Sequence, residues 1–207
     1  TRYLTAGEVG LTRVLVEAAT LLSGLSQLGT SASILRYYPY FKDEKNKDNG
    51  FFFWSIVIPL IGFALFSLVY VILKTPITSY FAEKSELFNS FYFYVLPLAF
   101  FLLYVTVFEA NANVLLRIVV PKFVREVLVR VLSLGCYLIY AFRLISLEGF
   151  VIAFCGVYAV AMIIDIVYLF RLGKISIRPN YAFLTPEIKR NYLFYTAFLV
   201  VASLATT

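Results

Sequence analysis

The 207-residue sequence has no histidine, one methionine, one tryptophan and only two cysteines. Without histidine the chain cannot use His-based acid–base catalysis, a His-containing zinc site or His-ligated haem. Cys136 and Cys155 each lie inside an apolar segment, where a free cysteine behaves as a small buried hydrophobic residue. The sequence also has no Walker A motif, G-x-S-x-G motif or His-Asp pair. We therefore expect no enzyme activity, no cofactor and no metal site.

Charged residues are also scarce. They make up 14% of the chain, against 61% hydrophobic residues, and the mean hydropathy is +0.85. Soluble domains contain about 25% charged and about 45–50% apolar residues. The composition therefore predicts an all-α, polytopic helical membrane protein whose immediate partners are membrane lipids. The net charge of +6 orients such a chain in the bilayer and does not indicate nucleic-acid binding.

Apolar segments long enough to cross a bilayer predict about six transmembrane helices. Five of them cover residues 11–35, 51–73, 87–108, 123–142 and 149–170, and a sixth begins near residue 191. The chain begins without Met and ends in an apolar run, so we expect a piece of a longer protein. Residues 1–180 would form an N-terminal lobe, and residues 181–207 a cytoplasmic connection and the start of a second lobe.

Polar and proline-containing stretches predict the helix boundaries. Thr5 and Glu8 have the spacing of a capping box before the first helix. Pro39 predicts a break after the first helix, followed by a solvated loop over 42–50. We expect short connections over 74–86 and 143–148, and a helix start at Thr185-Pro186-Glu187. We expect Glu109 to be a charge at a helix end. Pro59 and Pro97 predict kinks within their helices.

The basic residues of the connections fall mostly on one side of the membrane. Twelve Lys and Arg belong to the side that includes loop 36–50, and four to the side that includes residues 1–10. By the positive-inside rule, loop 36–50 is cytoplasmic and residues 1–10 lie outside. The chain would then be a multi-pass protein of a bacterial cytoplasmic (inner) membrane.

The first apolar segment carries a polar stripe along one helical face. Its members follow one another at steps of three or four residues, which places them on the same side of an α-helix; they are Arg13, Glu17, Thr20, Gly24, Gln27 and Ser31. Such a stripe is costly against lipid, so we expect it to face other helices or a water-filled cavity. Small residues at this spacing also serve helix packing, and both interpretations remain open.

Arg13 and Glu17 are the strongest candidates for a functional site, because ionisable groups inside a membrane helix are costly and are functional-site candidates by default. A guanidinium can bind phosphate oxygens through two hydrogen bonds. Arg13 could therefore contact an anionic substrate, with Glu17 holding it in place or responding to protons or cations. The alternative is an i,i+4 ion pair that neutralises itself near the outer interface.

Three further residues have weaker claims. Arg125 and Arg130 are either interfacial side chains that extend to the cytoplasmic surface or a second basic contact for phosphate. Asp165 is either a solvated helix end, a partner for a nearby arginine, or a site for a coupling ion, proton or sodium.

Two stretches resemble a known family. The first is YLTAGEVGLTRVLVEAATLLSGLSQLGTSASILRYYPYF, whose residues Thr5, Glu8, Gly10, Leu28, Gly29 and Arg36 match a loose family pattern. The second is FLTPEIKRNYLFYTAFLVVASL. Both resemble bacterial polysaccharide flippases of the multidrug/oligosaccharidyl-lipid/polysaccharide exporter superfamily. A related lipid II flippase has a functional arginine in the span corresponding to the first segment, and Arg13 is the position that would match it.

The resemblance implies a two-lobe transporter of roughly 12–14 helices around a central cavity, of which this chain holds the second to seventh. It implies a cargo as well, a lipid-linked oligosaccharide of the undecaprenyl-pyrophosphate type, flipped for polysaccharide or O-antigen export. Arg13, Glu17, Thr20, Gln27, Arg125 and Arg130 would contact this cargo, and Asp165 would bind the coupling ion. The alternatives are a cation-coupled multidrug exporter of the same superfamily, an integral-membrane enzyme of glycan assembly, or a structural subunit.

Overall fold

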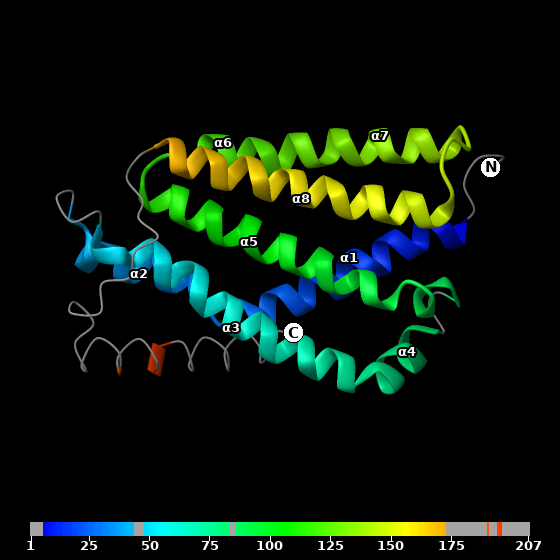
Figure 1. Ribbon diagram of the computed structural model, residues 1–207, viewed down its shortest axis with the longest axis horizontal. Helices are drawn as coiled ribbons and strands as arrows, with labels where there is room; N and C mark the ends of the chain where they lie inside the picture. Colours follow the sequence, from blue (N-terminus) through cyan, green and yellow to red (C-terminus); the bar gives the residue numbers. More distant parts are fainter. Residues whose placement is uncertain (1–5, 44–47, 83–85, 173–189, 191–193, 196–207) are drawn as a thin grey trace.

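The computed structural model describes residues 6–43, 48–82, 86–172, 190 and 194–195 (Figure 1). Within these ranges the regular structure is helical and contains no strand, which confirms the all-α prediction. The helices are α1 (Ala6–Ser26), α2 (Thr30–Phe41), η1 (Asp48–Gly50), α3 (Phe51–Ile72), α4 (Lys74–Ala82), η2 (Glu86–Asn89), η3 (Tyr92–Tyr94), α5 (Val95–Val114), α6 (Val119–Phe123), η4 (Val124–Leu128), α7 (Val129–Ala141) and α8 (Leu147–Arg171).

Among the described residues, four helical runs are long and apolar enough to cross a membrane: Gly7–Phe41, Asp48–Ile72, Tyr92–Val114 and Leu147–Arg171. The chain is therefore a multi-pass helical membrane protein. A fifth helical run over 119–141 consists of α6, η4 and α7 and carries four charged residues. The sixth expected span, and the helix start at Thr185, fall largely outside the described residues. A total of six spans stays a prediction.

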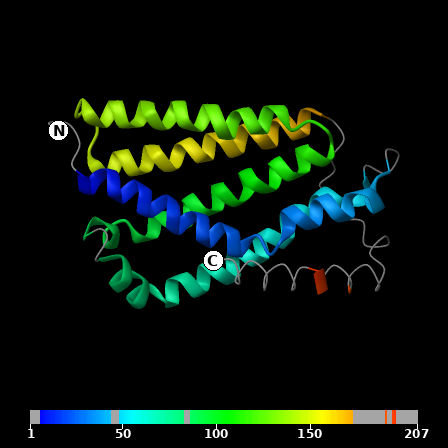
Figure 2. The ribbon, with the colours of Figure 1, turned by 180° about the vertical axis from the view of Figure 1, so that it is seen from behind.

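Helix α5 lies at the centre of the bundle. It packs against α1, α2, α3 and α8, and α7 packs on the far side of α8. In Figure 1, α7, α8 and α5 lie next to one another, with α3 beyond α5. Figure 2 shows α1 crossing α5 on the opposite face. The most buried part of the molecule is therefore the region where α1, α5 and α8 meet.

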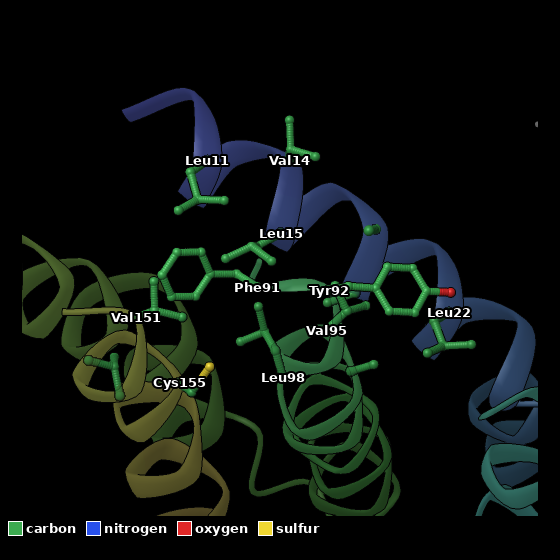
Figure 3. Packing of buried hydrophobic residues seen from close by; sticks show 14 of the residues in the cluster. Leu11, Val14, Leu15, Leu22, Phe91, Tyr92, Val95, Leu98, Val151 and Cys155 are labelled. Carbon is green, nitrogen blue, oxygen red and sulfur yellow. The ribbon is translucent and has the colours of Figure 1, made fainter. Parts of the chain in front are cut away.

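Large apolar side chains fill this region. Leu11 and Leu15 point from α1 towards Val95 and Leu98 at the start of α5, with Val151 of α8 beside them (Figure 3). All five are at most 1% exposed. A smaller cluster at the other end of the bundle joins α2, α3, α5 and the end of α8.

The first membrane segment is divided in two, where a single helix over 11–35 was expected. The chain breaks between Ser26 and Thr30, where Leu28 and Gly29 have positive φ angles of 49° and 65°. The expected break at Pro39 is wrong, because α2 continues through this residue to Phe41. A proline removes one backbone donor but does not end a helix whose other residues are held by packing. Thr5 of the expected capping box lies outside the described residues.

Two expected connections have more structure than their polarity indicates. The end of the 42–50 loop is buried, not solvated: the Asp48 carboxylate accepts hydrogen bonds from the Tyr38 hydroxyl and from the backbone N–H of Asp43. Asn49 donates to the carbonyl of Phe41. The connection expected from residue 74 contains helix α4 (Lys74–Ala82). Backbone and side-chain hydrogen bonds offset the low hydropathy of both stretches.

Two corrections concern α5. Pro97 is the third residue of this helix, not a residue in its middle. In the first turn the missing N–H of proline has no helical partner to lose, so Pro97 predicts no kink there. Glu109 does not lie at a helix end, because α5 continues to Val114. The helix extends past Phe108 because Ala110, Asn111 and Ala112 are buried against the bundle.

Polar and small residues join α3 to its neighbours. The amide of Asn111 on α5 donates to the Ser55 hydroxyl on α3 over 3.1 Å. At the other end of α3, the stacked rings of Tyr70 and Tyr92 each donate their hydroxyl to the backbone carbonyl of the other residue. Gly62 lies against the end of α1, where a Cβ atom would meet the Ser26 carbonyl oxygen closer than 3.0 Å.

Candidate functional site

The polar stripe of α1 lies on a surface that none of the other described helices covers. The side chains of Arg13 and Glu17 are 82% and 52% exposed, and Thr20 and Gly24 are exposed as well. A Cβ atom on Gly24 would have no neighbour within 4 Å among the described residues. The first part of the stripe, from Arg13 to Gly24, is therefore not packed against the other described helices.

The opposite face of α1 is buried. Its residues Leu11, Leu15 and Ala19 are at most 1% exposed and belong to the main core. Helix α1 is therefore amphipathic: its apolar face packs into the bundle, and its polar face points away from the bundle. An ionisable side chain on a membrane helix is costly in contact with lipid tails. The outward side of α1 is thus expected to meet water, a ligand or further protein.

Two hydrogen bonds between distant parts of the chain fix the start of α1. The Tyr140 hydroxyl donates to the Glu8 carboxylate at 2.5 Å, and the hydroxyls of Thr12 and Tyr137 lie 2.6 Å apart. Both tyrosines belong to α7. These contacts hold one face of α1 against α7, which determines the direction in which Arg13 and Glu17 project.

Arg13 and Glu17 form an ion pair in which Nε of Arg13 donates to Oε1 of Glu17 at 2.9 Å. This is the self-neutralising i,i+4 pair that the spacing allowed. The pair uses Nε of the guanidinium, so the remaining N–H groups of Arg13 stay available for an anion. Further along the stripe, the amide of Gln27 donates to the Ser31 hydroxyl, and both residues are half-buried.

Arg125 and Arg130 also have carboxylate partners. Nη1 of Arg125 donates to Oε2 of Glu109 at 2.7 Å, and Nη2 of Arg130 donates to Oε2 of Glu126 at 2.8 Å. Neither of these ion pairs involves a residue of α1, so the structure does not place the three arginines in one site. Arg125 belongs to η4, a single π-helical turn, and such turns occur frequently at functional sites.

Asp165 is the most unusual polar residue of the structure. It lies in α8 and is 0% exposed. Neither carboxylate oxygen has a hydrogen-bond partner among the described residues. A solvated helix end, one of the interpretations that its position allowed, is therefore wrong, and no described arginine pairs with it.

Glu109 was not among the predicted site residues. It follows an apolar segment and lies 16 residues from Arg125, a spacing that corresponds to no single helical face. In the structure its side chain is 17% exposed and joins α5 to η4. Glu109 is also the charged group that acts electrostatically on Asp165. The pair forms because the chain reverses direction after α5, and this reversal could not be predicted from residue spacing.

The two sites differ in what they can bind. Arg13 and Glu17 are an exposed, charged pair suited to an ionic ligand, whereas Asp165 is enclosed. Among the described residues, no three His, Cys, Asp or Glu side chains gather as a metal ion would require. Comparisons of the chain with protein-family models, with curated proteins and with solved structures give no match.

Proposed function

We propose that this protein is a membrane transporter that moves an amphiphilic molecule with an anionic head group between the two leaflets. The observation that carries the proposal is the exposed polar stripe of α1, with Arg13 and Glu17 at its start and a buried face behind it. A helix that only anchors a protein in lipid has no use for such a stripe. A cargo that keeps its tail in lipid while its head group follows a polar surface needs one.

The cargo we propose is a lipid-linked oligosaccharide of the undecaprenyl-pyrophosphate type. Two phosphates offer oxygen acceptors in the geometry that a guanidinium fits. The anion would compete with Glu17 for Arg13, so binding would exchange one charge-assisted hydrogen bond for another. Thr20, further along α1, and Gln27, just after its end, would receive the head group from there. The family resemblance supports this choice of cargo over other anionic lipids.

The orientation belongs to the same proposal. With residues 1–10 outside the cytoplasmic membrane and loop 36–50 in the cytoplasm, the Arg13–Glu17 pair lies towards the outer leaflet. Arg125 and Arg130 would then lie towards the cytoplasm and act on the cargo at a different stage. The separation of the arginines fits sequential contacts better than one common binding site.

A cation-coupled exporter is the second candidate, and Asp165 favours it. A buried carboxyl group inside a membrane helix is typical of proton and ion pathways. This candidate predicts that loss of the protein raises sensitivity to cationic drugs. The first candidate predicts that the lipid-linked intermediate accumulates.

The decisive experiment depletes the protein in its native host, quantifies lipid-linked oligosaccharide in lipid extracts, and then tests plasmid-borne variants at matched expression. We expect the intermediate to accumulate on depletion. We expect wild type to relieve the accumulation and Arg13→Ala to fail. Arg143→Ala is the matched control, because Arg143 is an exposed arginine in the turn between α7 and α8. No accumulation, together with sensitivity to cationic drugs, would reject the flippase in favour of the exporter.

A charge swap separates cargo binding from simple ion pairing. The double variant Arg13→Glu with Glu17→Arg keeps an i,i+4 pair of opposite charges on the same face. If the pair serves only to neutralise itself, the double variant restores activity that each single variant loses. If Arg13 contacts the head group, the guanidinium is displaced by one helical turn, about 5.4 Å, and activity stays low. We expect the second result.

A further inference from the structure

Asp165 occupies a position where an ionised carboxylate is poorly accommodated. On α8 it lies one turn from Ala161 and one turn from Leu169, and all three residues are 0% exposed. Its two oxygen atoms have no hydrogen-bond donor among the described residues. A carboxylate without donors or counter-ion loses its hydration without compensation, which strongly disfavours the charged form. The neutral acid avoids most of this cost.

A carboxylate on the neighbouring helix makes ionisation still less favourable. Glu109 lies on α5, which packs directly against α8, and it acts electrostatically on Asp165. Its own carboxylate is held by Arg125 at 2.7 Å. Glu109 therefore has the partner that Asp165 lacks among the described residues. A negative charge on a neighbouring helix disfavours ionisation of a second carboxyl group.

We propose that Asp165 is a proton-binding site, protonated while Glu109 stays ionised in its pair with Arg125. The bound species is a single proton taken from water, so that the carboxylate becomes a carboxylic acid and no other bond changes. A metal cation fits less well, because hard cations require about six oxygen ligands. The described residues around Asp165 do not provide such a set.

Asp165, Glu109 and Arg125 are also increasingly exposed in this order. The exposed fraction rises from 0% for Asp165 to 17% for the side chain of Glu109 and 49% for that of Arg125. Arg125 lies in the π-helical turn η4, which packs on α8. If Asp165 loses its proton, it becomes a second anion competing for Arg125. The protonation state of a buried residue would then change an ion pair that reaches the surface.

The other charged residues on the elements around α8 are few. On these elements they are Lys122 on α6, Glu126 on η4, Arg130 on α7, and Glu148 and Arg171 near the two ends of α8 itself. Glu126 and Arg130 pair with each other. Burial without a hydrogen-bond donor is the main reason for a neutral Asp165, and changing Glu109 tests the smaller contribution of the neighbouring charge.

Infrared spectroscopy of the purified full chain in lipid nanodiscs provides the test, because a protonated carboxylic acid has its own C=O stretching band. The measurement is made near neutral pH, where a solvated aspartate is ionised. We expect the wild-type spectrum to contain an acid band that Asp165→Asn removes. The matched control is Glu17→Gln, which changes an exposed carboxylate paired with Arg13 and should remove no acid band. Circular dichroism confirms equal helix content in all variants.

The two partners of the neighbouring ion pair should act in opposite directions. Glu109→Gln removes the negative neighbour and frees Arg125, so we expect the acid band of Asp165 to weaken. Arg125→Gln removes the cation, so we expect the band to be kept or strengthened. A band that survives Asp165→Asn, or no acid band in the wild type, would overturn the proposal. An equal loss of the band in both ion-pair variants would also overturn it, because that loss would indicate general disturbance of the fold.

This inference does not rest on the proposed cargo. The infrared band reports proton binding in the isolated protein, whereas the lipid analysis reports transport in cells. A flippase without a proton on Asp165, or a proton site in a protein that moves no lipid-linked oligosaccharide, would each be recognised by its own measurement.

Discussion

The close approach of α3 to the end of α1 can be tested by adding one methyl group. Gly62→Ala would place a Cβ atom closer than 3.0 Å to the carbonyl oxygen of Ser26, and 2.9 Å from two side-chain atoms of Leu28. The Leu28 side chain can rotate away, but the Ser26 oxygen belongs to the backbone. Ordinary contact begins near 3.4 Å, so the two helices must separate.

Overpacking of this kind costs about 1–3 kcal/mol. Against it stands the gain from replacing glycine within a helix, roughly 0.5–1 kcal/mol. We therefore expect Gly62→Ala to lower the free energy of unfolding by about 1–2 kcal/mol in sum. The loss should appear as a shift of the unfolding midpoint when the purified protein is titrated with a denaturing detergent and followed by circular dichroism.

Gly156→Ala is the matched control. Gly156 lies in α8, another helix long enough to cross the membrane, and a Cβ atom there would have no neighbour within 4 Å among the described residues. We expect this variant to be as stable as the wild type or slightly more stable. If Gly62→Ala is as stable as Gly156→Ala, the described contact between α1 and α3 is not tight, and the reasoning is refuted.

Three further results are expected. Tyr92→Phe keeps the stacked ring but removes the hydroxyl that donates to the Tyr70 carbonyl. The free energy of unfolding should fall by about 1 kcal/mol in the same detergent titration, and an unchanged midpoint would contradict the hydrogen bond. A double-mutant cycle of Ser55→Ala and Asn111→Ala should give a coupling energy of about 0.6 kcal/mol, whereas full additivity would mean that the two side chains do not interact. Both cysteines are buried, so a water-soluble maleimide should label the folded protein slowly and the unfolded protein fast, and rapid labelling of the folded protein would contradict their burial.

Hydropathy predicted the class of the protein and the length of its most apolar helices. Helix α3 covers Phe51–Ile72 where 51–73 was expected, and α8 covers Leu147–Arg171 where 149–170 was expected. Both segments are continuous apolar runs between polar residues, so composition alone limits where they can begin and end. Segments with mixed polarity were harder to predict from the sequence. Helix α4 and the two-part structure of the first membrane segment depend on local hydrogen bonds and backbone angles, which hydropathy does not describe.

The candidate site could be predicted only in part, because periodicity shows which residues share a face but not what that face meets. The spacing of Arg13 and Glu17 sufficed to predict their ion pair. It could not indicate that their face stays uncovered by the rest of the described bundle. Pairs between helices, such as Glu109 with Arg125, require knowledge of how the chain turns. The burial of Asp165 likewise depends on the residues that α5 presents to it.

The anchoring of α1 has a consequence for biosynthesis. The hydrogen-bond partners of Glu8 and Thr12 lie on α7, more than 120 residues later in the chain: 132 residues separate Glu8 from Tyr140, and 125 separate Thr12 from Tyr137. During translation α1 is therefore made long before these tyrosines leave the ribosome. The nascent helix must wait in the membrane, or beside the insertion machinery, without its hydrogen bonds to α7. A nascent chain arrested before α7 should accordingly remain bound to insertion factors.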